Sequence, residues 1–264
     1  MVTLHSFYND NTMKTFEELK YRFEFLASVL RSKGMVVDKL CLEPPVSETE
    51  LDKYEKKWNK KLPDEMRRFF LEVAGKIIFQ WGDENVDTRN NSILIRGLFK
   101  NTTHDFNHPH YKWPHSCGFE WSLKQMDWIY EAYWPAVEQD FEEENPISPY
   151  NYLYSYPFIY GICGELLCFY APPSGERAIF HYGDTMLEMW HKVADSFEEF
   201  WNSWSLLGCP EFQYECFYNK KLQKLDPFCK DAITWRQILE IEHLVNGKTE
   251  SSPPPEPCDD SRRD

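Results

Sequence analysis

The feature that most constrains this chain is a row of large aromatic side chains on one predicted helix. The stretch VADSFEEFWNSW, residues 193–204, places four rings at spacings of three and four, which puts them on one helix face. These rings are Phe197, Phe200, Trp201 and Trp204. So wide an aromatic face needs another large apolar surface to cover it. We therefore expect the stripe to form core, and Asp195 to cap the helix with Glu198 at the third position.

Start signals predict further helices along the chain. Thr15 with Glu18, and Ser47 with Glu50, have the spacing of capping boxes and precede apolar residues at helical intervals. Pro63 ends the second helix and favours the start of a third. The predicted helices other than the aromatic one cover residues 15–32, 47–58, 63–74, about 121–141, and 233–245.

Strands are indicated in the middle of the chain. β-Branched and aromatic runs bounded by turn residues predict strands at Ile77–Trp81 and Ser92–Phe99. Gly161–Tyr170 and Arg177–Tyr182 predict a hairpin across the loop Ala171–Glu176.

Helical and strand segments in separate runs favour an α+β fold. We expect a mixed, mostly antiparallel sheet with helices packed against it, and helical extensions at both ends. The aromatic stripe then packs on the sheet face that carries Leu167 and Phe169, or on the helix of residues 66–73. The sequence leaves these two alternatives open.

The charge balance excludes some classes of partner. Lys and Arg number 29 against 43 Asp and Glu, which gives a net charge of −14. Such a chain lacks the basic face that nucleic acid or anionic lipid requires, and it suits a cationic partner. The charged first thirty residues do not resemble a signal peptide, and no apolar run reaches about 18 residues. We therefore expect a cytoplasmic protein, with its eight cysteines mostly buried, reduced thiols.

Two stretches resemble one known family. The first is PVSETELDKYEKKWNKKLPDEMRRFFLEVAG, residues 45–75, with two helices around a Leu-Pro break. The second is GELLCFYAPPSGERAIFHYGD, residues 164–184, followed by the aromatic helix of residues 193–204. In this order they are similar to the SUKH superfamily, which includes fungal cell-wall synthesis regulators and bacterial toxin-immunity proteins.

The resemblance implies a binding function without catalysis or cofactor. It implies a SUKH-like α+β fold and, most concretely, an immunity protein that neutralises a cognate toxin by occluding it. An intracellular regulatory scaffold of the same fold is the alternative. The expected organisation is an N-terminal helical extension at 1–44, a SUKH-like domain at 45–210, a C-terminal helical extension at 211–248, and a disordered tail at 249–264.

Charge is segregated in a span that is also rich in Trp and Tyr. Between Gln125 and Glu176 there are nine acidic residues and neither Lys nor Arg. Carboxylates attract a basic partner and aromatic side chains anchor it, so we predict a binding face for a basic toxin domain. Its predicted residues are Glu138, Asp140, Glu142, Glu143, Glu144, Trp134, Tyr152 and Tyr154. The alternative is a solvated acidic loop beside core aromatics.

Histidines gather in one other segment. Within 14 residues the chain carries His104, Asp105, His108, His110, His115 and Cys117. These side chains are zinc ligands in other proteins, which raises a zinc-dependent hydrolase as a function of a different class. No paired ligand spacing typical of zinc sites is present, so we favour a surface loop without metal.

A cysteine nucleophile is the last candidate. Cys163 and Cys168 lie on one strand of the predicted hairpin, and His181 lies on the other. A cysteine–histidine pair across the hairpin would be needed for catalysis. Buried structural cysteines are far commoner, so we expect no catalytic residue here.

Overall fold

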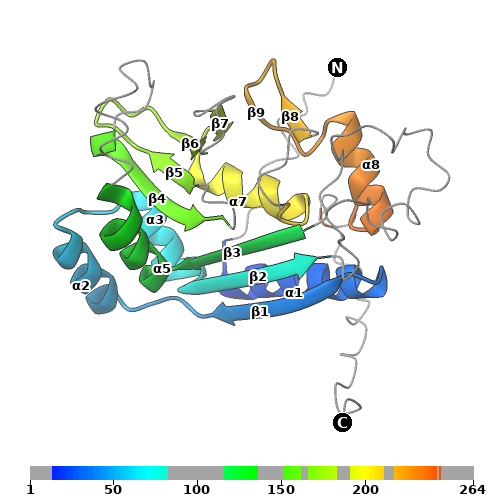
Figure 1. Ribbon diagram of the computed structural model, residues 1–264, viewed down its shortest axis with the longest axis horizontal. Coiled ribbons are helices and arrows are strands. Elements are labelled where there is room, and N and C mark those ends of the chain that lie inside the picture. Colours follow the sequence, from blue (N-terminus) through cyan, green and yellow to red (C-terminus); the bar gives the residue numbers. More distant parts are fainter. Residues whose placement is uncertain are drawn as a thin grey trace, which may run out of the picture.

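The computed structural model describes residues 14–82, 116–135, 152–161, 166–182, 191–210, 217–242 and 244, and its fold is α+β as predicted (Figure 1). The N-terminal half contains α1 (Phe16–Ser32), β1 (Val36–Glu43), α2 (Glu48–Trp58), α3 (Asp64–Arg68), the π-helical turn η2 (Phe69–Val73), β2 (Lys76–Gly82) and β3 (Ser116–Ser122). There follow α5 (Leu123–Trp128), η3 (Ile129–Tyr133), η4 (Tyr152–Tyr154), β4 (Ser155–Tyr160), β5 (Leu166–Tyr170), β6 (Ala178–Tyr182), β7 (His191–Ala194), α7 (Phe197–Leu206), β8 (Tyr218–Asn219), β9 (Lys224–Leu225) and α8 (Lys230–Leu239).

The first sheet is antiparallel, in the order β1-β2-β3. Ile77 pairs with Trp121 and Phe79 with Phe119, so these apolar side chains share one face of the sheet. Helix α1 packs here through Phe23, whose ring meets that of Phe79 edge-on at 5.3 Å between centroids.

The second sheet is antiparallel in the order β4-β5-β6-β7, and it contains the predicted hairpin. Strands β5 and β6 are buried along their whole length. One face belongs to the main core through Leu167, Phe169 and Ile179. The other face belongs to a second apolar cluster, covered by η3 through Ile129.

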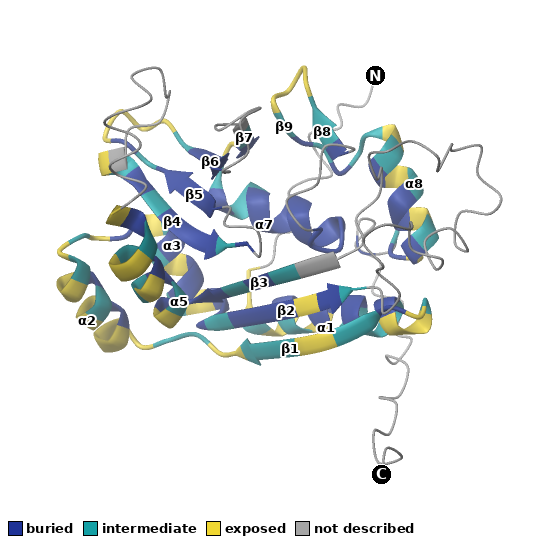
Figure 2. Ribbon diagram, in the orientation of Figure 1, coloured by how far each residue is buried: buried dark blue, intermediate teal, exposed yellow. Residues whose placement is uncertain are grey.

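Helix α7 joins the two sheets, and Figure 2 shows it as buried between them. Its four predicted core rings are each 1% exposed, so the aromatic stripe is confirmed as core. The Trp201 ring stacks on Phe69 of η2 at 5.1 Å. The ring of Trp204 lies 4.6 Å from Phe119 of β3, and that of Phe197 lies 5.6 Å from Phe169 of β5. The stripe therefore packs on both surfaces that the sequence left as alternatives.

The first turns of three helices are capped by side-chain hydroxyl groups. Thr15 Oγ1 accepts from the Glu18 N–H at 3.2 Å and Ser47 Oγ from the Glu50 N–H at 3.2 Å, so both predicted starts are confirmed. At α7 the predicted cap is wrong by one residue. Ser196 Oγ, and not Asp195, caps the helix by accepting from Glu199 N–H at 3.1 Å. The Asp195 carboxylate instead pairs with two lysines, Lys192 and Lys224, each at 2.6 Å.

Other differences concern strands. The predicted N-terminal helical extension also contains β1, which pairs with β2 across the boundary placed at residue 44. Trp121 lies in β3, so the helix predicted from residue 121 begins at Leu123. Residues 155–160, which were not predicted as a strand, form β4. The predicted C-terminal helical extension also contains the β8–β9 pair, and the last helix begins at Lys230. The predicted strand at 92–99 and the tail at 249–264 lie outside the described residues.

Gly75 lies between η2 and β2 and hydrogen-bonds to the chain at the end of β1. Its N–H donates to the main-chain oxygens of Glu43, at 3.2 Å, and Pro44, at 3.1 Å. A Cβ at this position would lie 2.6 Å from the Pro44 oxygen and 2.7 Å from Val46 Cγ1. Only glycine allows the two segments to approach this closely.

Candidate functional site

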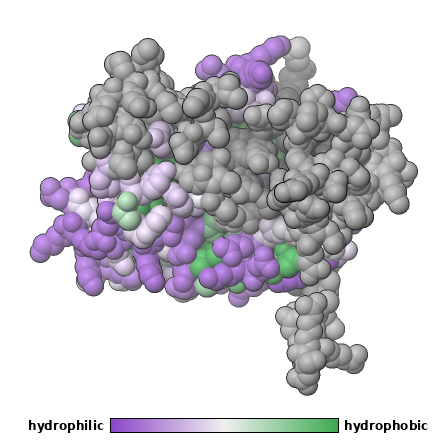
Figure 3. Space-filling view, viewed as in Figure 1, coloured by the Kyte–Doolittle hydropathy of each residue, from purple (hydrophilic) through white to green (hydrophobic). Residues whose placement is uncertain are grey.

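A group of three aromatic rings, one exposed and two half-buried, lies where α5 and η3 meet β4. The Tyr160 ring meets Trp128 at 5.0 Å and Tyr133 at 4.9 Å, both close to edge-on. We call Trp128, Tyr133 and Tyr160 the aromatic patch. Trp128 is 44% exposed, although it is among the largest apolar side chains of the protein. Figure 3 shows pale, weakly polar side chains gathered over α5, beside the hydrophilic surface of α2.

The patch is held in place by contacts between α5 and α2. Trp58 Nε1 donates to Asp127 Oδ1 at 2.9 Å, and Lys57 Nζ lies 2.6 Å from Asp127 Oδ2. The same ammonium lies 2.7 Å from Glu131 Oε1. Hydrogen bonds from Lys57 to Asp127 and then Glu131 raise the pKa of this lysine. Two of the nine carboxylates in the acidic span therefore share one lysine, which precedes Asp127 by 70 residues.

A shallow hollow of about 330 Å³ adjoins the patch between α2 and η3. Lys60 lies at its wall, donating to the Ser155 main-chain oxygen at 3.0 Å and lying 4.4 Å above the Tyr156 ring. This cation–π contact joins the end of α2 to β4. Trp134 and Pro135 close the other side of the hollow, at the point where the chain enters residues 136–151.

Three of the eight predicted binding residues, Trp134, Tyr152 and Tyr154, lie in the described part of the chain. Trp134 is 3% exposed and belongs to the second apolar cluster, so the prediction that it is a surface anchor needs correction. The helical segment that carries Trp134 directs this side chain toward the second sheet. Tyr154 is half-buried against the same cluster, and Tyr152 begins η4. The carboxylates lie outside the described residues, and they are Glu138, Asp140, Glu142, Glu143 and Glu144.

Trp128, Tyr133 and Tyr160, which form the aromatic patch, were not among the predicted binding residues. A helical signal for Trp128 was present, since the buried residues Leu123, Met126 and Ile129 repeat every third position and Trp128 lies off that row. Tyr160 had no such signal, because its contact with Trp128 depends on β4 packing beside α5.

The pairing of Cys168 with His181 is excluded by strand register. Leu167 lies opposite His181 and Cys168 lies opposite Phe180, so Cys168 and His181 point to opposite faces of the sheet. Burial also raises the pKa of the Cys168 thiol well above its usual value. Cys163 lies outside the described residues. The four described cysteines with placed side chains are free thiols: Cys41, Cys168, Cys209 and Cys229.

The described residues form neither a metal-ligand cluster nor a membrane-spanning helix. In the described segments, three or more His, Cys, Asp or Glu side chains nowhere come together as a metal site. The segment from His104 to His115 lies outside those residues, as does the side chain of Cys117. Among the helices that the structure places, none is long and apolar enough to cross a membrane.

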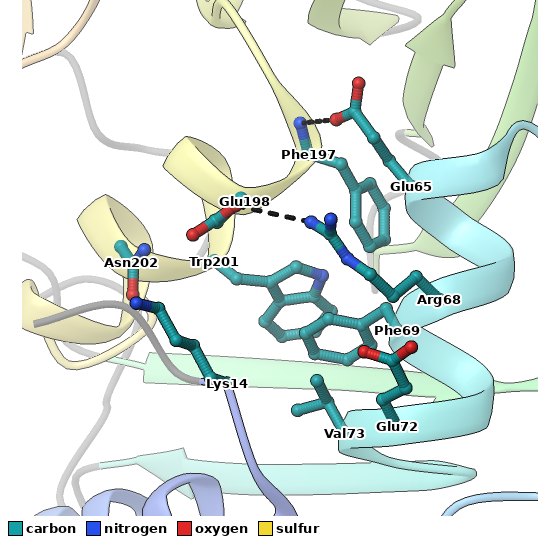
Figure 4. Close-up of a pocket in the computed structure, with 10 residues that line it drawn as sticks. All are labelled: Lys14, Glu65, Arg68, Phe69, Glu72, Val73, Phe197, Glu198, Trp201 and Asn202. Atoms are coloured by element: carbon teal, nitrogen blue, oxygen red, sulfur yellow. Dashed lines mark hydrogen bonds and ion pairs between the residues drawn. The ribbon is translucent and has the colours of Figure 1, made fainter. Parts of the chain in front are cut away.

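A second hollow lies between α3–η2 and α7, on a different part of the surface, with a volume of about 240 Å³ (Figure 4). We call it the α3–α7 groove. Phe69 and Trp201 form its floor, and an ion pair of 3.4 Å between Arg68 and Glu198 spans it. Glu65 joins its walls by accepting from the Phe197 N–H at 3.0 Å.

The arrangement of two antiparallel sheets with α7 packed between them is consistent with a domain of the SUKH superfamily. Residues 45–203 match the model of the SMI1 / KNR4 family (SUKH-1), and the chain belongs to this family. Members are known as immunity proteins or regulators, and their domains are generally non-catalytic. A search of curated proteins finds no match.

Proposed function

We propose that this chain is a non-catalytic immunity protein that neutralises a cognate toxin by covering a basic surface of the toxin domain. The observation that carries this proposal is the aromatic patch of Trp128, Tyr133 and Tyr160, with Trp128 exposed, on elements that flank the acidic segment of residues 136–151 in the sequence. Family membership supports a binding function of this kind.

The aromatic patch has the properties of an interface centre. Tryptophan and tyrosine dominate the binding energy of protein interfaces, because a large rigid ring is buried at little entropic cost. The Asp127–Trp58 and Asp127–Lys57 contacts fix α5 before a partner arrives. A partner therefore binds an ordered surface, which lowers the entropic cost of binding.

In the sequence, the acidic segment directly follows the helical segment that carries Trp128 and Tyr133. The segment leaves the helix at Pro135 and rejoins the described chain at Tyr152. Glu138 is three residues beyond Pro135, so about 11 Å of extended chain is the most that separates them. The five carboxylates between Glu138 and Glu144 act at long range on a basic partner, while the aromatic rings act on contact.

Capture from the source cells tests this proposal. The wild-type chain is immobilised beside Trp128→Ala and a matched control, Tyr21→Ala, which removes a 39% exposed ring from α1. We expect Trp128→Ala to retain less than a tenth of the partner that the wild type and the control retain. Equal retention by all three proteins would contradict the role of the patch.

The identity of the captured partner separates immunity from regulation. We expect a basic protein whose toxic activity is lost when one equivalent of this chain is added. A retained partner with no toxic activity would favour the other role known in the family, an intracellular regulatory scaffold.

A further inference from the structure

The α3–α7 groove contains a buried hydrogen-bond donor without an acceptor. The Trp201 side chain is 1% exposed, and its ring is fixed between Phe69 and the other rings of α7. Its Nε1–H has no acceptor among the described residues. In Figure 4 the indole nitrogen lies on the edge of the ring that faces Arg68. A buried N–H of this kind is normally satisfied, so its partner is to be sought in whatever enters the groove.

Other buried indoles of this protein show which acceptor suits such a donor. Each of four donates to a main-chain carbonyl oxygen. The pairs are Trp81 with Gly208 at 3.1 Å, Trp121 with Ala74 at 3.2 Å, Trp204 with Pro210 at 2.9 Å and Trp235 with Leu207 at 2.9 Å. By the same chemistry, a main-chain carbonyl of an incoming segment fits the Trp201 Nε1–H.

The charges around the groove indicate that the incoming segment carries a cationic side chain. Glu65 is engaged by the Phe197 N–H and lies 3.6 Å from Arg177, and Glu198 is paired with Arg68. Glu72 is exposed and has no ion-pair partner in the part of the chain that the structure describes. Lys14 and Arg68 also line the groove, and in the view of Figure 4 the Lys14 ammonium lies toward Asn202, away from Glu72. Glu72 is therefore the group available to an incoming cation.

The floor and the size of the groove limit its occupant further. Phe69 and Val73 offer apolar surface beside Glu72, which suits the methylene stem of a long basic side chain (Figure 4). The volume of about 240 Å³ lies below the range of about 300–1,000 Å³ that is typical of small-molecule pockets. The groove is therefore suited to one residue of a protein rather than to a cofactor.

We propose that the α3–α7 groove binds one lysine residue from a loop of the basic partner. The main-chain carbonyl of this lysine accepts from Trp201 Nε1, its stem packs on Phe69 and Val73, and its ammonium pairs with Glu72. The bound loop displaces the exposed Arg68 side chain, which is 55% exposed and only loosely paired with Glu198. This proposal rests on the proposed function, because it takes the partner to be a basic protein.

Fragment titration of the full chain tests the groove without the partner. The probe is N-acetyl-lysine-N-methylamide, and its matched control is N-acetyl-norleucine-N-methylamide, which has the same stem without the ammonium. Binding is followed by the Trp201 indole cross-peak in ¹⁵N–¹H spectra, assigned as the one absent from Trp201→Phe. We expect saturable shifts with a millimolar Kd for the lysine probe and at least fivefold weaker binding of the norleucine probe.

Two surface variants keep the test independent of core stability. Glu72→Gln is expected to reduce lysine binding to the level of norleucine, whereas Glu50→Gln, an exposed carboxylate on α2, leaves it unchanged. Equal binding of both probes, or an unmoved Trp201 cross-peak, would overturn the proposal. Preferential binding of N-acetyl-glutamate-N-methylamide would also overturn it, since Lys14 and Arg68 would then define the site.

The experiments distinguish failure of the groove proposal from failure of the proposed function. The fragments report only on the groove, and partner capture by Trp128→Ala reports only on the aromatic patch. If the fragments fail while Trp128→Ala loses the partner, the immunity proposal stands and the groove proposal falls.

Discussion

The Trp58 indole N–H donates to Asp127 Oδ1 at 2.9 Å, which joins α2 to α5 across 69 residues of sequence. Asp127 immediately precedes Trp128, so this bond also sets the position of the aromatic patch. Lys57 Nζ, at 2.6 Å from the other carboxylate oxygen, completes the contact. Hydrogen bonds to a charged acceptor are stronger than neutral ones, which makes Asp127 the principal link between these helices.

Replacing Asp127 is therefore expected to weaken the fold near the patch. Asp127→Ala removes both contacts and should lower the free energy of unfolding by about 1–2 kcal/mol. Glu131→Ala is the matched control, because among the described residues its 61% exposed carboxylate pairs with Lys57 alone. This substitution should lower the free energy of unfolding by less than about 0.5 kcal/mol. Urea unfolding measures both, and equal losses for the two variants would refute the special role of Asp127.

The aromatic core predicts a large effect at Trp201. Trp201→Ala should lower the free energy of unfolding by about 3–5 kcal/mol, because it leaves a cavity among Phe69, Phe197 and Trp204. Trp128→Ala, on the 44% exposed ring, should cost less than about 1 kcal/mol. Thermal or urea unfolding distinguishes the two, and a small loss for Trp201→Ala would show that the core is packed differently.

Helix starts could be predicted because their signals are local. Thr15 and Ser47 contact main-chain groups three residues away, so a short stretch of sequence contains the whole interaction. Strand β1 was missed because its pairing with β2 depends on residues more than thirty positions away, and half-exposed edge strands lack a clear apolar pattern. β4 was missed because Pro157 and its tyrosines are also typical of a loop.

The site was harder to predict for the same reason. Trp128 and Trp134 lie on one continuous helical segment, and only packing against the second sheet decides that the first is exposed and the second buried. The lysine that pairs with both Asp127 and Glu131, Lys57, likewise comes from a distant helix. The acidic composition of the span could be read from sequence, but the placement of its aromatic contacts could not.

Cys168 is expected to be chemically inert in the folded protein. Burial raises the pKa of its thiol, so at pH 8 the group stays protonated and the reactive thiolate is absent. Cys41, half-buried on β1, should react with iodoacetamide much faster. Mass spectrometry of peptides after timed alkylation measures both, and equally rapid modification of Cys168 would contradict its environment.

The purified protein is expected to carry no zinc. The segment from His104 to Cys117 lacks the paired ligand spacing of zinc sites. Metal analysis after purification without chelators should give much less than one zinc per chain. About one zinc per chain would restore the zinc-dependent hydrolase as a function to test.

The central claim is that the acidic segment captures a basic partner, and association kinetics test it most directly. The variant reverses Glu138, Asp140, Glu142, Glu143 and Glu144 to Lys. Unchanged urea unfolding serves as the control that the variant is folded.

The measurement is the on-rate of each protein with the captured partner at 0.1 M and 1 M salt, between which the Debye length falls from about 10 Å to about 3 Å. We predict that the wild-type on-rate falls at least tenfold with added salt. The reversal variant should associate more slowly at 0.1 M, with an on-rate that does not fall as salt rises. Equal on-rates for the two proteins at both salt concentrations would contradict the account.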